Sequence, residues 1–314
     1  MRVVVCDPIH EAGIKELEAA GMDLEQAAEY DESDLDAAIA RANALIVRSG
    51  TSVTAERIEA ADELQIIARA GIGVDNIDLE AATKTGVQVV NAPTGGVGAV
   101  TEHTTAMAYA MIRELPWTDR RTKAGEWPKG TYDGSELRGS TLGIVGLGNI
   151  GQSVAKRAIT LDVEVIGYDP YVRQAVVDDL GIDLVSLDSC FEQADIVTVH
   201  TPLTPETEGL IDEEILDNLE DGYLINCSRG GVVDEEALVE ALSSGHIAGA
   251  AIDVFADEPL EADHPLTDCE RVLLTPHVAG TSDRAQQTIA ESVARQIIAV
   301  AAGEAVDHPV NEIN

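Results

Sequence analysis

The sequence predicts an α/β protein built on parallel β-sheets. Short runs rich in β-branched residues alternate with helical patterns along the whole chain, and this alternation is typical of parallel sheets. The chain has 314 residues, of which 45% are hydrophobic, so it is long enough for two domains with buried cores. The sequence contains no short internal repeat and no low-complexity tract that would favour another architecture.

The first part of the chain alternates strands with helices. Strands are predicted at residues 3–6, 44–48, 64–69 and 87–91. Helices are predicted between them at residues 9–20, 33–41 and 79–85. A longer helical stretch at residues 99–115, with the segment that follows to about residue 123, leads into a second unit.

The second unit repeats the same alternation. Its strands are predicted at residues 141–145, 164–168, 196–199, 223–226, 248–252 and 272–274. A last helix is predicted at residues 283–302, because apolar residues recur there at helical spacing. The residues of this apolar stripe are Ile289, Val293, Ile297 and Val300.

Charge is the unusual feature of the composition. The chain has 57 acidic and 20 basic residues, a formal net charge of −37. Such a chain would repel a polyanion, which disfavours nucleic acid as a partner, and the acidic residues are spread along the sequence rather than gathered in a tail. At 1 M salt the Debye length is about 3 Å, so surface carboxylates no longer repel one another, whereas in dilute buffer they destabilise the compact state. We therefore expect a protein adapted to molar salt.

The cysteines and the N-terminal sequence favour a cytoplasmic protein. No two of the cysteines form a C-x-x-C pair, so neither a zinc site nor a redox motif is predicted, and we expect no bound metal. The cysteines are Cys6, Cys190, Cys227 and Cys269. The sequence enters a strand directly, without the basic start and apolar stretch of a signal peptide. Residues 99–115 are apolar-rich but include charged side chains, which predicts a buried helix rather than a membrane span.

A glycine-rich turn carries the first functional signal. Residues 146–151 read GLGNIG, directly after the predicted strand TLGIV and at the start of a helix that begins near Asn149. This strand–turn–helix context is the one that a dinucleotide-binding fingerprint requires. Gly146 permits the tight turn, Gly148 lets the backbone approach a pyrophosphate, and Gly151 lets the helix pack closely on the strand. The helix N-terminus adds free N–H groups and a positive dipole end for the phosphates.

A carboxylate follows at the end of the next strand. Asp169 ends the run VEVIGYD, about 20 residues after the turn, where a carboxylate accepts hydrogen bonds from the adenosine ribose hydroxyls. Because it would repel a 2′-phosphate, NAD is predicted as the cofactor rather than NADP. Arg173, which follows closely, could weaken that preference.

Three polar residues in the C-terminal half suggest hydride-transfer chemistry. Arg229, Glu258 and His277 each come just after a predicted strand, and the carboxyl ends of the strands of an open α/β sheet line one crevice. An arginine can clamp a substrate carboxylate with two hydrogen bonds. A histidine can exchange a proton with the C2 oxygen of a 2-hydroxy or 2-oxo acid, and a carboxylate beside it would set its tautomer. The three residues together predict an oxidoreductase for small 2-hydroxy acids.

Seven stretches of the sequence carry a family resemblance. They are VRSGTSVT, RAGIGVDNIDLEAAT, GLGNIG, HTPLTPET, NCSRGGVVDEEAL, AGAAIDVFADEP and LLTPHVAG, and they are spread over residues 47–280 of the chain. As a set they resemble the D-isomer-specific 2-hydroxyacid dehydrogenase family, and within it the phosphoglycerate dehydrogenases most of all. The resemblance implies an NAD-dependent enzyme, a homodimer, that oxidises D-3-phosphoglycerate to 3-phosphohydroxypyruvate for serine biosynthesis.

The resemblance also implies a domain plan and a set of site residues. Two Rossmann-like domains would face each other across a cleft, with residues 1–97 and 283–314 binding substrate and residues 98–282 binding NAD. Arg229 would clamp the substrate carboxylate, Glu258 would partner the base, and His277 would be the acid/base. Cofactor contacts are implied at Gly146, Gly148, Asn149, Ile150, Gly151, Asp169, Thr201, Pro202, Cys227, Ser228, Asp253, His277 and Gly280. Substrate contacts are implied at Arg48, Ser49, Gly71, Ile72, Gly73, Lys129 and Arg229.

One loop departs from the family pattern and leaves the substrate open. In residues 91–100, Val97 stands where the resembling sequences often have a polar residue, and Gly98 adds flexibility. A glyoxylate or hydroxypyruvate reductase is therefore the alternative enzyme. Formate dehydrogenases also resemble the family, but they pair the histidine with glutamine, so Glu258 speaks against them. A different class, an NAD(H)-sensing binding protein similar to transcriptional corepressors, stays open because such proteins can keep the same three residues.

Overall fold

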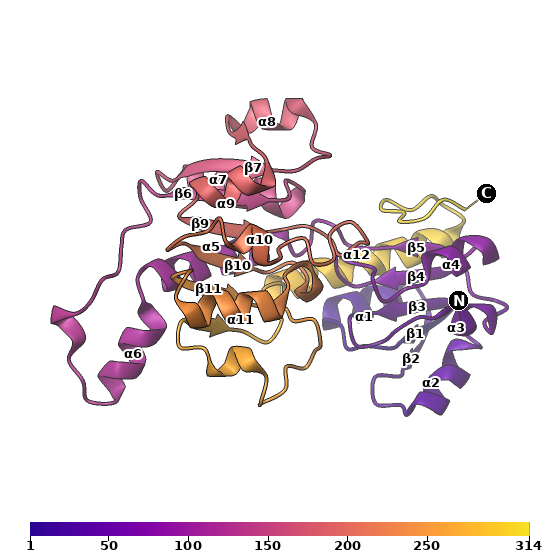
Figure 1. Cartoon of the computed structure of the whole chain (residues 1–314). Coiled ribbons are helices and arrows are strands. Elements are labelled where there is room, and N and C mark those ends of the chain that lie inside the picture. Colours follow the sequence, from indigo (N-terminus) through magenta and orange to yellow (C-terminus); the bar gives the residue numbers. More distant parts are fainter. Residues whose placement is uncertain (314) are drawn as a thin grey trace. The chain divides into compact units, whose positions relative to one another are not determined.

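The computed structural model describes residues 1–313, and within it the chain forms two compact units (Figure 1). Unit 1 consists of Met1–Gly96 and the segment that begins at Gly280, and unit 2 consists of Val97–Ala279. The chain therefore passes between the units twice, after Gly96 and after Ala279. The assignment of substrate binding to unit 1 and of NAD binding to unit 2 comes from the sequence, and it stays a prediction at this point.

Unit 1 is a five-stranded parallel sheet covered by helices. The strands lie in the order β2-β1-β3-β4-β5, and every pair between neighbours is parallel. The strands are β1 Arg2–Val5, β2 Asp23–Gln26, β3 Ala44–Val47, β4 Ile66–Arg69 and β5 Gln88–Val90. The helices are α1 Glu11–Ala19, α2 Glu32–Ile39, α3 Ala55–Glu59, α4 Leu79–Thr85 and α12 Asp283–Ala302.

The last helix of the chain completes the core of unit 1. In Figure 1 α12, in yellow, runs beside α1 and the N-terminal sheet. The apolar stripe predicted for this helix contributes Ile289, Val293 and Ile297, which are buried in the same cluster as β-strand residues such as Val3 and Ile66. A segment near the end of the sequence thus supplies one face of a core that the first 96 residues leave open.

Unit 2 is a seven-stranded parallel sheet with helices on its faces. The strand order is β12-β11-β10-β9-β6-β7-β8, so β6 lies between β9 and β7 and the order reverses at β6. The strands are β6 Thr141–Val145, β7 Glu164–Tyr168, β8 Asp183–Leu184, β9 Ile196–Val199, β10 Tyr223–Asn226, β11 Gly249–Ile252 and β12 Val272–Leu274. The helices are α5 Val97–Ile112, α6 Leu115–Lys123, α7 Asn149–Ile159, α8 Gln174–Leu180, α9 Leu187–Gln193, α10 Glu213–Leu216 and α11 Glu235–Ser244. Short 3₁₀ turns are η1 Pro128–Gly130, η2 Gly230–Val232 and η3 Pro265–Asp268.

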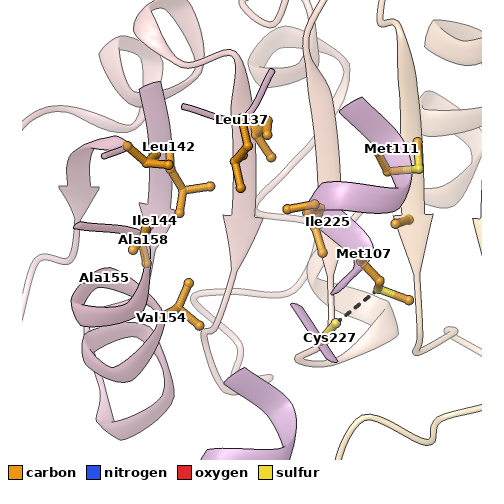
Figure 2. Close-up of a cluster of buried hydrophobic side chains, with 14 of the residues drawn as sticks. Met107, Met111, Leu137, Leu142, Ile144, Val154, Ala155, Ala158, Ile225 and Cys227 are labelled. Carbon is orange, nitrogen blue, oxygen red and sulfur yellow. Dashed lines mark hydrogen bonds between the residues drawn. The ribbon is translucent and has the colours of Figure 1, made fainter. Parts of the chain in front are cut away.

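One core of unit 2 joins α5 and α7 to the sheet. Figure 2 shows this cluster, in which side chains from α5 (Met107, Met111), from β6 (Leu142, Ile144) and from α7 meet Ile225 of β10. All of these side chains are buried. The packing places the amino end of α7 beside the carboxyl end of β6, where dinucleotides bind in open α/β sheets.

The predicted fold class, α/β with two parallel sheets, is confirmed, and several of the predicted elements need correction, including the absence of a helix where α3 lies. The sequence does not predict β2 and β8, because both are edge strands with polar, partly exposed sequences that lack the apolar signal of a buried strand. The helix predicted at residues 99–115 ends at Ile112, and α6 begins separately at Leu115. Between them Glu114 has a left-handed backbone with φ 48°, a conformation that interrupts a right-handed helix.

None of the helices within residues 1–313 combines the length and the apolar character needed to cross a membrane.

Candidate active site

The glycine-rich turn joins β6 to α7 at the point where the strand order reverses. Gly146 has φ 95°, a backbone conformation that glycine adopts without strain. A Cβ at Gly151 would lie 2.0 Å from Gly146 O, so only glycine fits there. Beside Gly148, in contrast, a Cβ would meet no described atom within 4 Å, and Ile150 packs toward the core behind the turn. The turn is therefore tightly closed on its inner side and open at Gly148, as a bound pyrophosphate requires.

Asp169 ties the turn to the end of β7. Its Oδ2 accepts a hydrogen bond from Leu147 N at 2.8 Å, and its Oδ1 accepts one from Tyr171 N at 2.8 Å. A carboxylate has about four acceptor positions, so Asp169 can still accept ribose hydroxyls. Helix α7 begins at Asn149, and its N-cap residue Gly148 supplies no side chain to occupy the first N–H groups of the helix. Those groups are available to an anion.

The carboxyl end of β9 adds two polar atoms that fit a ligand site. His200, Thr201 and Pro202 follow β9, and a Cβ at Gly146 would lie 2.8 Å from His200 O, so the two backbones touch. His200 Nδ1 and Thr201 Oγ1 are buried and have no hydrogen-bond partner within the described residues. Buried polar groups are normally hydrogen-bonded, so a water or a ligand fits here. Burial lowers the pKa of His200 to about 4, which keeps the ring neutral.

A hydrogen-bonded turn after β10 presents Arg229. Asn226 Oδ1 accepts from Ser228 N at 3.0 Å and from Ser228 Oγ at 2.8 Å, while Asn226 Nδ2 donates to Arg229 O at 2.9 Å. Behind the turn, a Cβ at Gly230 would lie 1.9 Å from the carbonyl carbon of Phe255. The buried Asn226 and the close approach at Gly230 thus fix the backbone from which the Arg229 side chain extends.

Cys227 lies in this turn but belongs to the core. Its Sγ is 3.6 Å from Met107 Sδ (Figure 2), and burial raises the pKa of the thiol to about 12. The thiolate form needed for a nucleophile is therefore absent at neutral pH.

His277 and Glu258 form a close pair at the end of the sheet. His277 Nδ1 lies 2.7 Å from Glu258 Oε2, and Glu258 Oε1 accepts a hydrogen bond from Phe255 N at 3.0 Å. The side chains of the pair are 40% and 34% exposed, so both reach solvent or a ligand. No described residue within hydrogen-bond distance engages His277 Nε2. The geometry therefore orients Nδ1 toward the carboxylate and leaves Nε2 for proton exchange.

Asp253 holds the loop that carries His277. Its carboxylate is buried and accepts hydrogen bonds from Thr275 Oγ1 at 2.5 Å and from the backbone N–H groups of Val278 and Ala279 at 2.9 Å. Its carbonyl oxygen accepts from His277 N at 2.8 Å. His277 itself has a left-handed backbone with φ 53°, which is disfavoured for a residue with a side chain. The Asp253 contacts stabilise that conformation.

His103 is not among the site residues that the sequence predicts. In the structure its Nε2 lies 3.2 Å from Thr275 Oγ1 and 3.6 Å from Asp253 Oδ1. Both partners lie far along the chain, 172 positions away in the case of Thr275, so no local pattern indicates the contacts. The contacts of His103 result from the packing of α5 against β10 and β11, so only a prediction of that packing would have revealed them.

The residues predicted to bind the substrate carboxylate lie partly in unit 1. Arg48 and Ser49 follow β3, and Gly71–Gly73 form the turn after β4. Gly71 N donates to the carbonyl of the last residue of β4 at 2.8 Å, and the substrate contact implied for Gly71 stays a prediction. The N–H groups of Ile72 and Gly73 have no hydrogen-bond partner within residues 1–313 and remain available.

Lys129 and Gly280, two further predicted contact residues, lie in different units. Lys129 is exposed in η1 of unit 2, next to Trp127, whose surface is 80% exposed. Gly280 is the first residue of the return to unit 1, where its carbonyl accepts a hydrogen bond from Gln286 Nε2 at 3.0 Å. Across the described part of the chain, no group of three or more His, Cys, Asp and Glu side chains is placed to hold a metal ion.

Comparison with known proteins identifies the family. The sequence model of the D-isomer specific 2-hydroxyacid dehydrogenase NAD binding domain matches residues 105–279, which make up most of unit 2. The chain belongs to the D-isomer specific 2-hydroxyacid dehydrogenase family. The family resemblance and the NAD cofactor predicted from the sequence are thereby confirmed, and the glycine-rich turn, Asp169 and the β9 end described above fit such a cofactor.

Relatives within this dehydrogenase family cover the whole chain. D-3-phosphoglycerate dehydrogenase of Archaeoglobus fulgidus is 41% identical over 312 residues, which is 99% of this chain and 59% of that protein. D-3-phosphoglycerate dehydrogenase of Methanocaldococcus jannaschii is 43% identical over 316 residues, 100% of this chain and 60% of that protein. The chain thus spans about 60% of the length of these curated relatives.

Solved structures from the family agree with the fold. The TT0316 protein from Thermus thermophilus superposes with a TM-score of 0.92 at 33% identity, over 99% of this chain and 100% of that one. The NAD-dependent formate dehydrogenase from Staphylococcus aureus, in complex with NAD, gives a TM-score of 0.88 at 31% identity over 100% of both chains. The two-sheet Rossmann-like architecture of the family is therefore present in this chain.

Proposed function

We propose that this chain is an NAD-dependent dehydrogenase that interconverts a D-2-hydroxy acid and the corresponding 2-oxo acid. The observation that carries the proposal is the His277–Glu258 pair, 2.7 Å apart, in the same unit as a turn that fits a dinucleotide. NAD, when bound, supplies the hydride acceptor for C2, and NADH supplies the donor. In this reading unit 2 binds the cofactor and unit 1 contributes to substrate binding.

The proton chemistry belongs to His277. With Nδ1–H donating to Glu258 Oε2, the neutral ring carries its lone pair on Nε2 and can take the proton of the C2 hydroxyl during oxidation. Glu258 then stabilises the imidazolium, because its carboxylate is hydrogen-bonded to the ring that becomes charged. In the reductive direction the imidazolium returns the proton to the C2 oxygen.

The substrate carboxylate needs a cation and backbone donors. Arg229 supplies a planar guanidinium on the turn that Asn226 holds, and it can also steady charge that develops on the C2 oxygen. From unit 1 we propose contributions by Arg48, Ser49 and the N–H groups of Ile72 and Gly73.

D-3-phosphoglycerate is the substrate we favour, with 3-phosphohydroxypyruvate as its oxidation product. Both curated relatives described above carry the name D-3-phosphoglycerate dehydrogenase. Lys129, an exposed cation in unit 2, is the residue we propose for the substrate phosphate. The alternative substrates are glyoxylate and hydroxypyruvate, which the apolar Val97 at the first crossing between the units favours.

The test is a set of initial rates with NADH in about 2 M KCl, a concentration that screens surface charge. We expect reduction of phosphohydroxypyruvate with a higher kcat/KM than hydroxypyruvate or glyoxylate. His277→Ala should lower kcat by at least about 10²-fold, the usual contribution of a general acid/base, whereas His246→Ala, remote from the pair, should not. Folded protein that binds NADH but reduces none of these acids would refute the enzyme and favour an NAD(H)-sensing binding protein.

Lys129→Ala separates the two substrate classes. It should raise KM for phosphohydroxypyruvate and leave KM for glyoxylate unchanged, because only the first substrate carries a phosphate. Equal effects on both acids would remove Lys129 from the site.

We also propose that the protein is a homodimer. Large apolar side chains are exposed on α6 and the loop after it, with Leu115 at 53% and Trp127 at 80% exposure, and we propose that a second copy of the chain covers them. Sedimentation at high salt should give a dimer that Trp127→Glu converts to monomer. A monomeric wild-type protein would contradict this proposal.

A further inference from the structure

His103 makes its polar contacts with the loop that carries His277. It lies in the second turn of α5, on the segment that has just entered unit 2. Its side chain is 24% exposed, while the side chain of the Asp253 that it faces is 1% exposed. A buried carboxylate is normally hydrogen-bonded, and here the Thr275 hydroxyl, which His103 contacts, donates to Asp253 beside the backbone N–H groups of the His277 loop.

The direction of the hydrogen bonds follows from the chemistry of the three groups. Asp253 can only accept, so at 2.5 Å Thr275 Oγ1 must donate its proton to Asp253 Oδ1. Thr275 Oγ1 is then an acceptor for His103 Nε2, 3.2 Å away. The proton of the His103 ring that faces the site is therefore on Nε2, and the chain of donors runs from His103 through Thr275 to Asp253.

Asp253, the acceptor at the end of this chain of hydrogen bonds, stabilises the backbone around His277. Asp253 Oδ1 also accepts from Val278 N, and Oδ2 accepts from Ala279 N. These two N–H groups directly follow the left-handed residue His277, whose φ is 53°. A shift of the Asp253 carboxylate would release that conformation and move the imidazole away from its place beside Glu258.

We propose that His103 is a positioning residue for the acid/base His277, acting through Thr275 and Asp253. This inference rests on the proposed function and names a residue outside the predicted site. Asp253 follows β11 at the edge of the sheet where a dinucleotide binds. His277, on the loop that Asp253 holds through Val278 N and Ala279 N, is itself a predicted cofactor contact, so we expect the same chain of hydrogen bonds to support NADH binding.

The test compares two replacements of His103. His103→Leu removes the donor, whereas His103→Gln places an amide nitrogen near the position of Nε2 and can still donate to Thr275. We expect His103→Leu to lower kcat by about 10- to 100-fold, as loss of a supporting hydrogen bond does elsewhere, with KM for the 2-oxo acid changed less than about threefold because Arg229 is untouched. The Kd of NADH, measured by fluorescence without substrate, should rise severalfold. His103→Gln should restore kcat and Kd to near wild-type values.

Thr275 provides a second pair of variants that does not alter α5. Thr275→Val lacks the hydroxyl and should match His103→Leu, while Thr275→Ser keeps it and should match wild type; this pair decides the question if His103→Leu does not fold. His246→Leu, whose ring contacts Asp217 O on another loop, is the matched control and should leave kcat and Kd unchanged.

Two results would overturn the inference: His103→Leu with kcat and NADH affinity within about twofold of wild type, or His103→Gln as impaired as His103→Leu. If wild-type protein reduces no 2-oxo acid, the proposed function fails, and the NADH titration still decides the role of His103. Weaker NADH binding in His103→Leu with recovery in His103→Gln would support the positioning role even then.

Discussion

His200, which follows β9 and has a buried Nδ1, is expected to make the free energy of unfolding depend on pH. His200 as a whole is partly exposed, but its Nδ1 is shielded from water, and burial lowers the pKa of the ring from 6.5 to about 4. In the unfolded chain the ring takes up a proton as the pH falls through 6.5, whereas in the folded protein it stays neutral until about pH 4. The unfolded state thus binds more protons between these values, and folding loses stability as the pH falls.

The size of the effect follows from the pKa difference. The full difference corresponds to roughly 3 kcal/mol, of which about 2 kcal/mol is expressed between about pH 7.5 and pH 5. Carboxylates titrate over part of this range as well, so the comparison must be with a variant. His200→Gln keeps a group that can hydrogen-bond to Thr198 Oγ1, which lies 3.0 Å from His200 Nε2, and it removes the titration.

Urea unfolding of both proteins in about 2 M KCl, at several pH values from about 7.5 to 5, gives the free energies. Over this range the free energy of unfolding of wild type should fall by about 2 kcal/mol more than that of His200→Gln. This expectation does not depend on the difference in stability between the two proteins at pH of about 7.5. Parallel pH profiles for the two proteins would refute the burial argument, because they would mean that His200 titrates alike in the folded and unfolded states.

Three further predictions concern the site and the surface. Glu258→Gln should lower kcat by about 10- to 100-fold because the amide no longer stabilises the His277 imidazolium. The control Asp257→Asn removes the same charge one residue away and should leave kcat unchanged. Equal kcat values for the two variants would contradict a role of Glu258 as the partner of His277. Gly230→Ala should destabilise the protein by about 1–3 kcal/mol in urea unfolding, since its Cβ would lie 1.9 Å from Phe255 C. Gly98→Ala, with open space around its Cβ, is the control and should be neutral or stabilising. The melting temperature should rise as KCl is raised from about 0.1 to 2 M, because screening removes repulsion within a net charge of −37; a constant melting temperature would exclude adaptation to salt.

Local patterns accounted for most of the fold. Strands β6 at Thr141–Val145 and β9 at Ile196–Val199, and the helix α12 at Asp283–Ala302, lie where the sequence predicts them. The two strands are short, mostly apolar runs that are buried, and the helix carries apolar residues at helical spacing on its buried side. The edge strands β2 and β8 were not predicted, because each pairs with another strand on one side only and most of its side chains are partly or fully exposed. Their sequences therefore lack an apolar pattern.

The candidate site was predictable in part. Arg229, Glu258 and His277 could be named because each follows a predicted strand and has a residue type that the chemistry needs. The hydrogen bond from Gly71 N to Arg69 O depends on the backbone conformation of the turn after β4, so composition and spacing could not predict it.

By itself the sequence determined most of the buried strands, the parallel α/β class and the chemistry of the dinucleotide turn, because these depend on the spacing of apolar residues and glycines over a few positions. Only the tertiary structure decided that His103, Asp253 and Thr275 form one hydrogen-bonded chain behind His277. These residues are far apart in sequence, and they meet because the apolar face of α5 packs on the sheet. The free energy that brings them together comes from the burial of apolar side chains. The apolar pattern in the sequence predicts that burial but does not predict which polar residues meet as a result.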